Sequence, residues 1–301
     1  MPMGELFGRR VAEVLGVGLV EMRRLSGGDV AEAYRVDLAD GRTVFAKTHA
    51  DPPPDFFSTE AIGLSWLADA TAAAATTSSE PVGLEVARVI ASDDDLLVLA
   101  WIDEGRPVES TETDFGRALA RLHRVGAPVF GRSDRRTTGS RALPNEPMAN
   151  WAEFYARNRL EPLARLARQG GALGEASIHR LVGVAGRLGE IDASNEPPAL
   201  LHGDLWAGNR LIDGRGLSWL IDPAVHGGHR EFDLAMMELF GGFGDECWRG
   251  YDDEFPLAAG WRDRVPLHQL APLVVHAIKF GGGYASAVDR ALDACDLLTE
   301  L

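Results

Sequence analysis

The hydrophobic pattern of the chain changes about a third of the way along, and this change limits the folds it can adopt. Up to about residue 103, apolar residues stand in short β-type runs separated by turn formers, such as "ADGR" at 39–42 and "SDDD" at 92–95. From Asp114 onward, apolar residues recur at helical spacing. A sheet-forming part followed by a helical part indicates an α+β chain with two lobes.

One segment of the first part departs from the strand pattern. Between the third and fourth predicted strands, residues 57–67 carry apolar side chains at helical spacing. These are Phe57, Ala61, Leu64 and Leu67. We therefore expect an N-terminal lobe, residues 1–103, with a five-stranded antiparallel sheet plus a helix, and a mainly helical C-terminal lobe, residues 104–301. Small ligands often bind in the cleft between two lobes.

The composition argues against several classes of function. The 301 residues include 45 acidic and 30 basic side chains, a formal net charge of −15, which opposes long-range attraction to DNA or RNA. The longest apolar runs are shorter than the roughly 18 residues of a membrane-spanning helix, and the N-terminus lacks the apolar core of a secretory signal. We expect a cytoplasmic protein that binds neither nucleic acid nor membrane, with Cys247 and Cys295 as partly buried thiols.

The stretch "LLHGDLWAGNRLI" at 200–212 carries the strongest functional motif. Asp204 precedes Asn209 by five residues, and Asn209 precedes Asp222 by thirteen, with two β-like runs and a turn between them. Kinase-type phosphoryl transfer needs an acid that accepts a hydroxyl proton, and an Asn and an Asp that hold Mg²⁺. The spacing matches the H-R-D-x-x-x-x-N and D-F-G elements of protein kinases. We therefore expect Asp204 to be the catalytic base and Asn209 and Asp222 to be the metal ligands.

Three weaker signals stand upstream in the order found in kinases. Gly27 and Gly28 fall in a predicted hairpin turn, where backbone amides can approach phosphates. Lys47 lies on the next predicted strand, and Glu60 lies thirteen residues further on, in the predicted helix. Such a pair holds a lysine on nucleotide phosphates in kinase folds. Each residue alone would more often be a turn or surface residue, but their order together favours ATP binding.

Other interpretations compete with this one. The sequence "HGGH" places His226 and His229 three residues apart, and with His202 they could bind zinc, although the intervening glycines would orient the ligands poorly. Taken singly, the motif residues could be ordinary turn and helix-capping residues. The chain could also be a nucleotide-binding pseudokinase, but a degenerate kinase usually loses one of the key residues, and here all are present.

Four stretches together resemble the fructosamine kinase (ketosamine-3-kinase) family, within the wider group of aminoglycoside phosphotransferases and protein-kinase-like enzymes. They are "GGDVAEAYRV" at 27–36, "FSTEAIGL" at 57–64, "LLHGDLWAGN" at 200–209 and "LIDPAVHGGHREFDLAMMELFGGF" at 220–243. The resemblance implies a bilobal protein-kinase-like fold. It also implies ATP- and Mg²⁺-dependent phosphorylation of the sugar 3-hydroxyl of a ketosamine, free or on a glycated protein. The phosphorylated adduct then releases its amine, which would be a deglycation repair.

The same resemblance implies roles for further residues. The backbone of Ala100, Trp101 and Ile102 is expected to contact adenine, and Asp233 is expected to brace the catalytic loop. The other residues, expected to be structural or on the substrate side, are His202, Trp206, His229, Arg230 and Glu231. The motifs do not separate fructosamines from ribulosamines, or a ketosamine from another small hydroxylated molecule such as an aminoglycoside. Nothing in the sequence specifies an oligomeric state.

Overall fold

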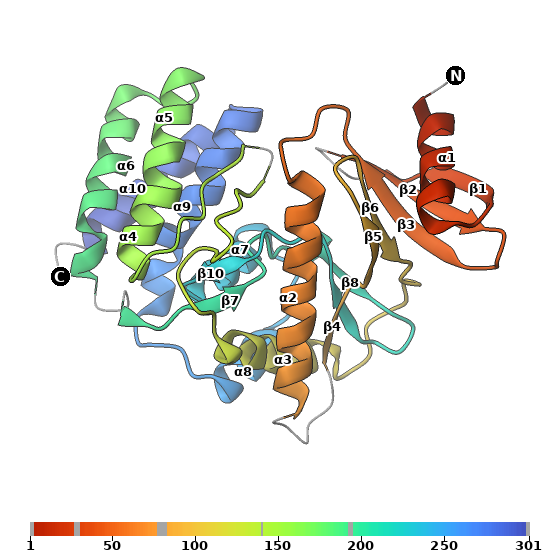
Figure 1. The fold of residues 1–301 in the computed structure, drawn as a ribbon. Helices are drawn as coiled ribbons and strands as arrows, with labels where there is room; N and C mark the ends of the chain where they lie inside the picture. Colours follow the sequence, from red (N-terminus) through yellow and green to blue (C-terminus); the bar gives the residue numbers. More distant parts are fainter. Residues whose placement is uncertain (1–2, 27–30, 77–82, 140, 192–194, 299–301) are drawn as a thin grey trace.

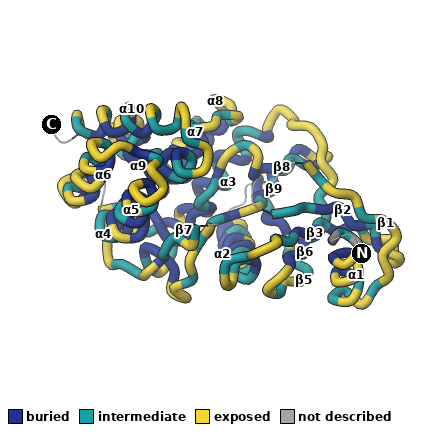
Figure 2. Tube along the Cα trace, turned by 90° about the horizontal axis from the view of Figure 1, so that it is seen from above, coloured by how far each residue is buried: buried dark blue, intermediate teal, exposed yellow. Residues whose placement is uncertain are grey.

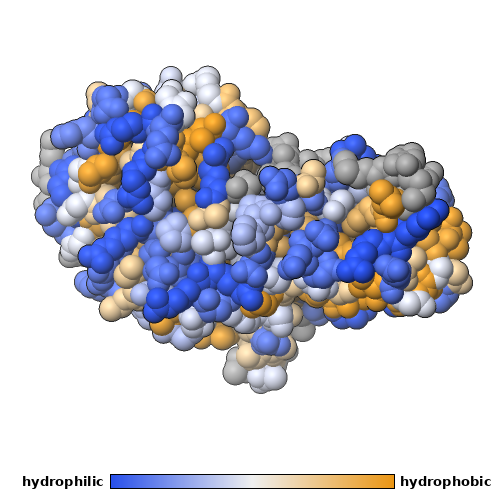
Figure 3. All heavy atoms as spheres, turned by 45° about the horizontal axis from the view of Figure 1, so that its top comes forward, coloured by the Kyte–Doolittle hydropathy of each residue, from blue (hydrophilic) through white to orange (hydrophobic). Residues whose placement is uncertain are grey.

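The chain folds into a sheet-containing part and a larger helical part, with one long helix between them (Figure 1). The computed structural model describes residues 3–26, 31–76, 83–139, 141–191 and 195–298. Figure 3 shows the two parts side by side, with polar residues over much of the face in view. Among the described residues, none of the helices has the length and hydrophobicity needed to cross a membrane.

The N-terminal sheet has five antiparallel strands, as the sequence predicts. Along the sheet they follow the order β1-β2-β3-β6-β5. The strands are β1 (Leu19–Arg24), β2 (Glu32–Leu38), β3 (Thr43–Thr48), β5 (Val89–Ser92) and β6 (Leu96–Ala100). Strand β1 forms an edge and is mostly exposed, which Figure 2 shows in yellow. The strands β3 and β6, inside the sheet, have the largest share of buried residues.

Two helices cover opposite faces of this sheet. Helix α1 (Met3–Leu15) contributes Val11 to a cluster that includes Val98 of β6. Helix α2 (Phe56–Thr76) contributes Leu64 to a second cluster that includes Leu97 of β6. Because neighbouring side chains of a strand point to opposite faces, "LLVLA" is apolar throughout and is buried on both sides.

The C-terminal part is mainly helical, also as predicted. Its helical elements include α3 (Thr111–Val125), α4 (Trp151–Tyr155), η1 (Ala156–Leu160), α5 (Glu161–Gln169), α6 (Glu175–Arg187), η2 (Leu188–Glu190), α7 (Glu231–Phe240), α8 (Asp245–Glu254), α9 (Trp261–Phe280) and α10 (Gly283–Leu298). Helices α4, α5, α6, α9 and α10 share one apolar core, and they lie together in Figure 1. Cys247 and Cys295 are buried, unpaired thiols.

Two small sheets connect distant segments and support the site. Strand β4 (Leu84–Val86) runs parallel to β9 (Ser218–Leu220), which forms a hairpin with β8 (Arg210–Ile212). Strand β7 (Ala199–Leu201) pairs with β10 (His226–Gly228). The sequence predicts the β8–β9 hairpin, but it does not predict the β4–β9 and β7–β10 pairings, because neither pair is close in sequence.

Candidate functional site

The predicted catalytic loop leaves β7 at His202 and returns to β8 through the short helix η4 (Ala207–Asn209). Gly203 allows the loop to turn here, because its φ is +82° and a Cβ would lie 2.2 Å from the carbonyl oxygen of Ala224. His202 is fully buried, and its Nε2 lies 2.9 Å from the carbonyl oxygen of Ile221. Burial lowers the pKa of His202, and the contact with Ile221 favours the structural role expected for it.

Asp233 holds this loop through backbone hydrogen bonds. Its carboxylate accepts the N–H of His202 at 2.7 Å and the N–H of Gly203 at 2.9 Å. His123 Nε2 lies 3.3 Å from the same carboxylate, and His123 Nδ1 lies 2.8 Å from the hydroxyl of Tyr251. The sequence does not reveal this contribution of His123 and Tyr251. The only local sign of this contribution in the sequence is the histidine itself, which lies in the amphipathic helix α3.

Asp204, Asn209 and Asp222 lie close together, as their spacing predicts. The Asn209 amide nitrogen donates to the Asp204 carbonyl oxygen at 2.9 Å and to Asp204 Oδ2 at 3.2 Å. The same nitrogen lies 3.5 Å from the Asp222 carbonyl oxygen. Because its amide nitrogen is directed at Asp204, Asn209 would offer its side-chain oxygen to a ligand. Amide and carboxylate oxygens are hard donors of the kind that Mg²⁺ prefers, so Asn209 and Asp222 fit a magnesium site.

Asp222 has an unusual backbone conformation. Its φ is +51°, in the left-handed region that Asp and Asn tolerate better than most residues with a side chain. Its carboxylate is about half exposed, unlike most of the residues around it. Strained conformations of this kind persist where the surroundings enforce them and are frequent at functional sites.

Lys47 is buried between two carboxylates. Its Nζ lies 2.6 Å from Glu60 Oε2 and 2.7 Å from Asp222 Oδ1. Burial alone would lower the pKa of Lys47, but the two carboxylates raise it above its ordinary value, so the ammonium is charged. For Asp222, the partial desolvation of its carboxylate would raise the pKa, but the attraction of Lys47 outweighs this effect and lowers the pKa. The structure thus brings together the strand lysine, the helix glutamate and the second acid of the motif.

Asp204 has a different electrostatic environment. Burial and the nearby Asp222 raise its pKa to about 7, despite the hydrogen bond from Asn209. A carboxyl group with a pKa near the working pH is suited to accept a proton from a hydroxyl. The two acids of the motif therefore differ in the way that a base and a metal ligand should differ.

The predicted nucleotide-binding backbone is only partly described. Gly27 and Gly28 lie outside the described residues. Ala100 ends β6 and donates its N–H to the Arg88 carbonyl oxygen at 2.9 Å, so adenine contacts from this segment would have to come from the Ala100 carbonyl group and the two residues that follow. Trp101 and Ile102 are half-buried.

Trp206 opens a row of rings beside the catalytic loop, which we call the aromatic face. Trp206 is 40% exposed, and its ring lies over Gly208, where a Cβ would stand 2.2 Å from the ring. Successive ring centroids are 6.0 Å apart for Trp206–Phe240, 5.2 Å for Phe240–His276 and 5.6 Å for His276–Phe280. The aromatic face consists of Trp206, Phe240, His276, Phe280 and Tyr284. Apart from Trp206, the sequence does not predict it, because its residues come from segments far apart in the chain, with Phe240 in α7, His276 and Phe280 in α9 and Tyr284 in α10.

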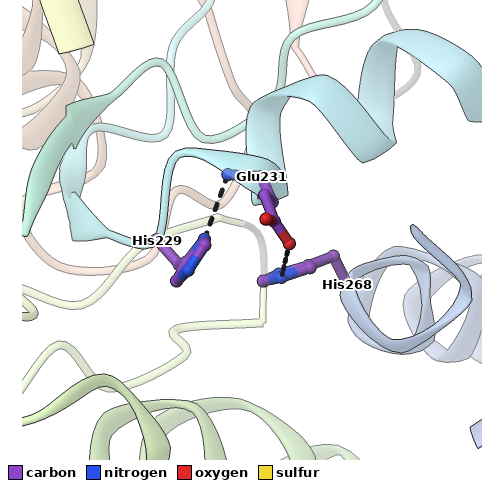
Figure 4. A group of neighbouring side chains, drawn as sticks. All are labelled: His229, Glu231 and His268. Carbon is purple, nitrogen blue, oxygen red and sulfur yellow. Dashed lines mark hydrogen bonds and ion pairs between the residues drawn. The ribbon is translucent and has the colours of Figure 1, made fainter. Parts of the chain in front are cut away.

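Residues 229–231 are buried. They were expected to be either structural or on the substrate side, and their contacts favour the structural role. Arg230 binds the Glu196 carboxylate with two nitrogens, each at 2.9 Å. Figure 4 shows His229, Glu231 and His268 in one group, with His268 Nε2 3.4 Å from Glu231. Their ligand atoms lie within 4.8 Å of one another. Arg264, however, donates to both Glu231 oxygens, at 2.6 and 2.9 Å, which leaves this carboxylate poorly suited to a metal ion.

The zinc site considered from the sequence does not form. His202 and His226 each have a ring nitrogen directed at a backbone carbonyl oxygen. Within the described part of the chain, neither of them joins His229 in a metal-binding group. His226 is buried between Phe154 and Phe232, and burial lowers its pKa to about 3.

We expect Arg264→Met to destabilise the protein by about 3–5 kcal/mol, because it leaves the fully buried Glu231 carboxylate without its guanidinium partner. Urea unfolding followed by circular dichroism would measure the loss. Arg262→Met is the matched control in the same helix, since the Arg262 side chain is 59% exposed and its ion pair with Glu238 should contribute less than about 1 kcal/mol. Equal losses in the two variants would contradict the assignment of a buried ion pair.

Comparison with known proteins identifies the family. The family model for fructosamine kinase matches residues 7–299. A protein named probable ketoamine kinase from Enterococcus faecium is 34% identical over 268 residues, which cover 89% of this chain and 92% of that protein. A crystal structure from Thermobifida fusca, provisionally named fructosamine-3-kinase, is 36% identical, covers 98% of both chains and superposes with a TM-score of 0.83. A choline kinase from Streptococcus pneumoniae shares the fold at 16% identity, with 97% of this chain and 98% of that chain covered and a TM-score of 0.65. The chain belongs to the fructosamine kinase family, with the protein-kinase-like fold of small-molecule phosphotransferases.

Proposed function

We propose that this protein transfers the γ-phosphoryl group of ATP to the 3-hydroxyl of a ketosamine. The observation that carries the proposal is the joint placement of Lys47, Glu60 and Asp222 in one ion-paired cluster. Asp204 and Asn209 are hydrogen-bonded beside that cluster. Family membership supports a phosphotransferase that acts on a ketoamine.

The nucleotide side consists of residues that bind or orient ATP. Lys47 would bind the phosphates, and Glu60 would keep its ammonium in place through the 2.6 Å ion pair. Asn209 and Asp222 would hold Mg²⁺, which when bound neutralises charge on the transferring phosphoryl group. The phosphate loop would include Gly27 and Gly28, and the adenine would contact the segment from Ala100 to Ile102. When Mg²⁺ and ATP bind, Lys47 would exchange its contact with Asp222 for one with phosphate.

The acceptor side is organised around Asp204. One of its carboxylate oxygens would accept the proton of the 3-hydroxyl as the hydroxyl oxygen attacks the γ-phosphorus, and ADP would leave with the electrons of the broken P–O bond. Asp233 would fix the loop through its backbone hydrogen bonds, so that Asp204 meets the acceptor in one orientation. Trp206 would provide part of the surface on which the sugar lies.

The product would be an unstable 3-phosphorylated ketosamine, which breaks down and releases the free amine. A reaction of this kind would reverse glycation of amines, and its need for ATP favours a cytoplasmic enzyme. Phosphorylation of an aminoglycoside is the second candidate, because the same fold and catalytic residues would support it; the acceptor surface is what would separate the two.

An ATP-consumption assay over several acceptors tests the proposal. The acceptors are fructoselysine, ribuloselysine, the free sugars and an aminoglycoside. We expect Mg²⁺-dependent ATP consumption with one or both ketosamines, and ³¹P NMR should place the new phosphate on the 3-oxygen. Consumption with the aminoglycoside alone would transfer the assignment to that substrate class. If ATP binds but none of the acceptors is phosphorylated, a pseudokinase becomes the better interpretation.

A further inference from the structure

A cation stands at the end of the aromatic face. Lys279 is exposed in the last turn of α9, and its Nζ lies 4.9 Å from the centroid of the Phe280 ring. Ring contacts link Phe280 through His276 and Phe240 to Trp206, which follows Asp204 by two residues. The row of rings thus begins beside the proposed base and ends at a positive charge.

The amino-acid usage of the chain makes this lysine unusual. The 30 basic residues are 28 arginines and two lysines, Lys47 and Lys279. Lys47 belongs to the proposed nucleotide side, and the charge of Lys279 acts on the acceptor side. Burial and Asp222 raise the pKa of Asp204, whereas Lys279 opposes them. A lysine ammonium is a compact point charge, which suits a single oxyanion.

The chemistry of a ketosamine suggests what would lie along this face. With the 3-hydroxyl at Asp204, the amine nitrogen on carbon 1 is only two carbons further along the sugar. In its protonated form this nitrogen is a cation, which aromatic rings attract. When the amine comes from a free α-amino acid, a carboxylate lies two bonds beyond the nitrogen. A ketosamine on the side chain of a protein lysine has no carboxylate at that position.

We propose that Lys279 is a specificity-determining residue that binds the carboxylate of ketosamines formed from free α-amino acids. The inference rests on the proposed function, which it deepens by naming the substrate class. The ammonium of such a substrate would lie against the aromatic face, and its carboxylate would pair with Lys279. Small amino-acid adducts would therefore be preferred over protein-bound ones.

A purely structural role for Lys279 predicts a different result. A cation in the last turn of a helix also stabilises the helix dipole, and this effect would be the same for every substrate. The test therefore compares two substrates of almost the same size, N-fructosylglycine, which carries a carboxylate, and N-fructosylglycinamide, which carries a neutral amide in its place. The measured quantity is the ratio of their kcat/KM values, acid over amide.

We expect kcat/KM of the wild type to be about five times higher for the acid than for the amide, which is the size of effect that an exposed or half-buried ion pair contributes. Lys279→Gln should bring this ratio close to one, mainly through a higher KM for the acid. Lys279→Arg should keep most of the preference, because the charge is retained. Arg290→Gln removes an exposed cation from α10 and is the matched control for net charge; its ratio should equal the wild-type value. Raising the ionic strength to 0.5 M should weaken the preference in the wild type.

The outcomes separate this inference from the proposed function. If both adducts are phosphorylated and the ratio is the same in wild type and Lys279→Gln, the role of Lys279 is refuted while the kinase assignment stands. A preference that Arg290→Gln abolishes equally would also refute it, as a general charge effect. If neither adduct nor any other ketosamine is phosphorylated, the proposed function itself fails.

Discussion

Asp204→Asn is expected to lower kcat for ketosamine phosphorylation by about 10²- to 10⁴-fold, the range that a general base contributes. The substitution keeps the size of the side chain and leaves an oxygen that can still accept the hydrogen bond from Asn209. It removes the group that would accept the hydroxyl proton. Because Asp204 serves the acceptor and not the nucleotide, the Kd for Mg·ATP should change by less than about threefold.

Two measurements on the purified variant test this expectation together. Steady-state kinetics with a saturating ketosamine gives kcat, and isothermal titration calorimetry gives the affinity for Mg·ATP. Asp69→Asn is a matched control, since Asp69 is exposed in the middle of α2, and it should retain wild-type values for both. Turnover by Asp204→Asn within about threefold of wild type would remove Asp204 from the role of base.

Local patterns predicted much of the fold because they depend on neighbouring residues. Short apolar runs bounded by turn formers predict the strands, and the helical spacing of Phe57, Leu64 and Leu67 predicts α2, where all three are buried. The predicted division at residue 103 remains a prediction. The apolar cluster around α2 also includes Leu84 and Phe115, so packing continues from the sheet-containing part into the helical part.

Contacts between distant segments could not be predicted in this way. The parallel pairing of β4 with β9 joins residues more than a hundred positions apart, and a three-residue strand has too short a pattern to recognise. Helix α8 carries little apolar periodicity, because its sequence "DECWRGYDDE" is strongly polar. Its tyrosine, Tyr251, reaches His123 only in the folded chain.

In the candidate site, too, contacts that follow from short-range spacing were predictable, whereas contacts between distant segments were not. The spacing of Asp204, Asn209 and Asp222 predicted a cluster, because a hairpin returns the chain to the loop. The order Lys47, Glu60 predicted an ion pair between a strand and its helix, and the 2.6 Å contact agrees with that expectation. The aromatic face was less predictable, since Phe240 and His276 are linked to Trp206 only through the packing of α7 and α9.

Asp222→Asn is expected to weaken Mg·ATP binding by at least about tenfold. Even the loss of a residue that only supports a metal ligand lowers metal affinity by about tenfold or more, and Asp222 is proposed as a ligand itself. Asparagine is a better replacement than alanine, because φ at this position is +51° and asparagine tolerates the left-handed region. Asp222→Ala should remove metal-dependent binding too, but with added backbone strain.

The role of Asp222 as a metal ligand can be separated from its ion pair with Lys47 by calorimetry with and without Mg²⁺. In EDTA, the wild type and Asp222→Asn should bind ATP with similar affinity, or the variant should bind slightly better, because Lys47 no longer has to leave Asp222. On adding Mg²⁺, only the wild type should gain affinity. If both proteins gain equally, Asp222 serves mainly to position Lys47, and the metal must be held by other groups.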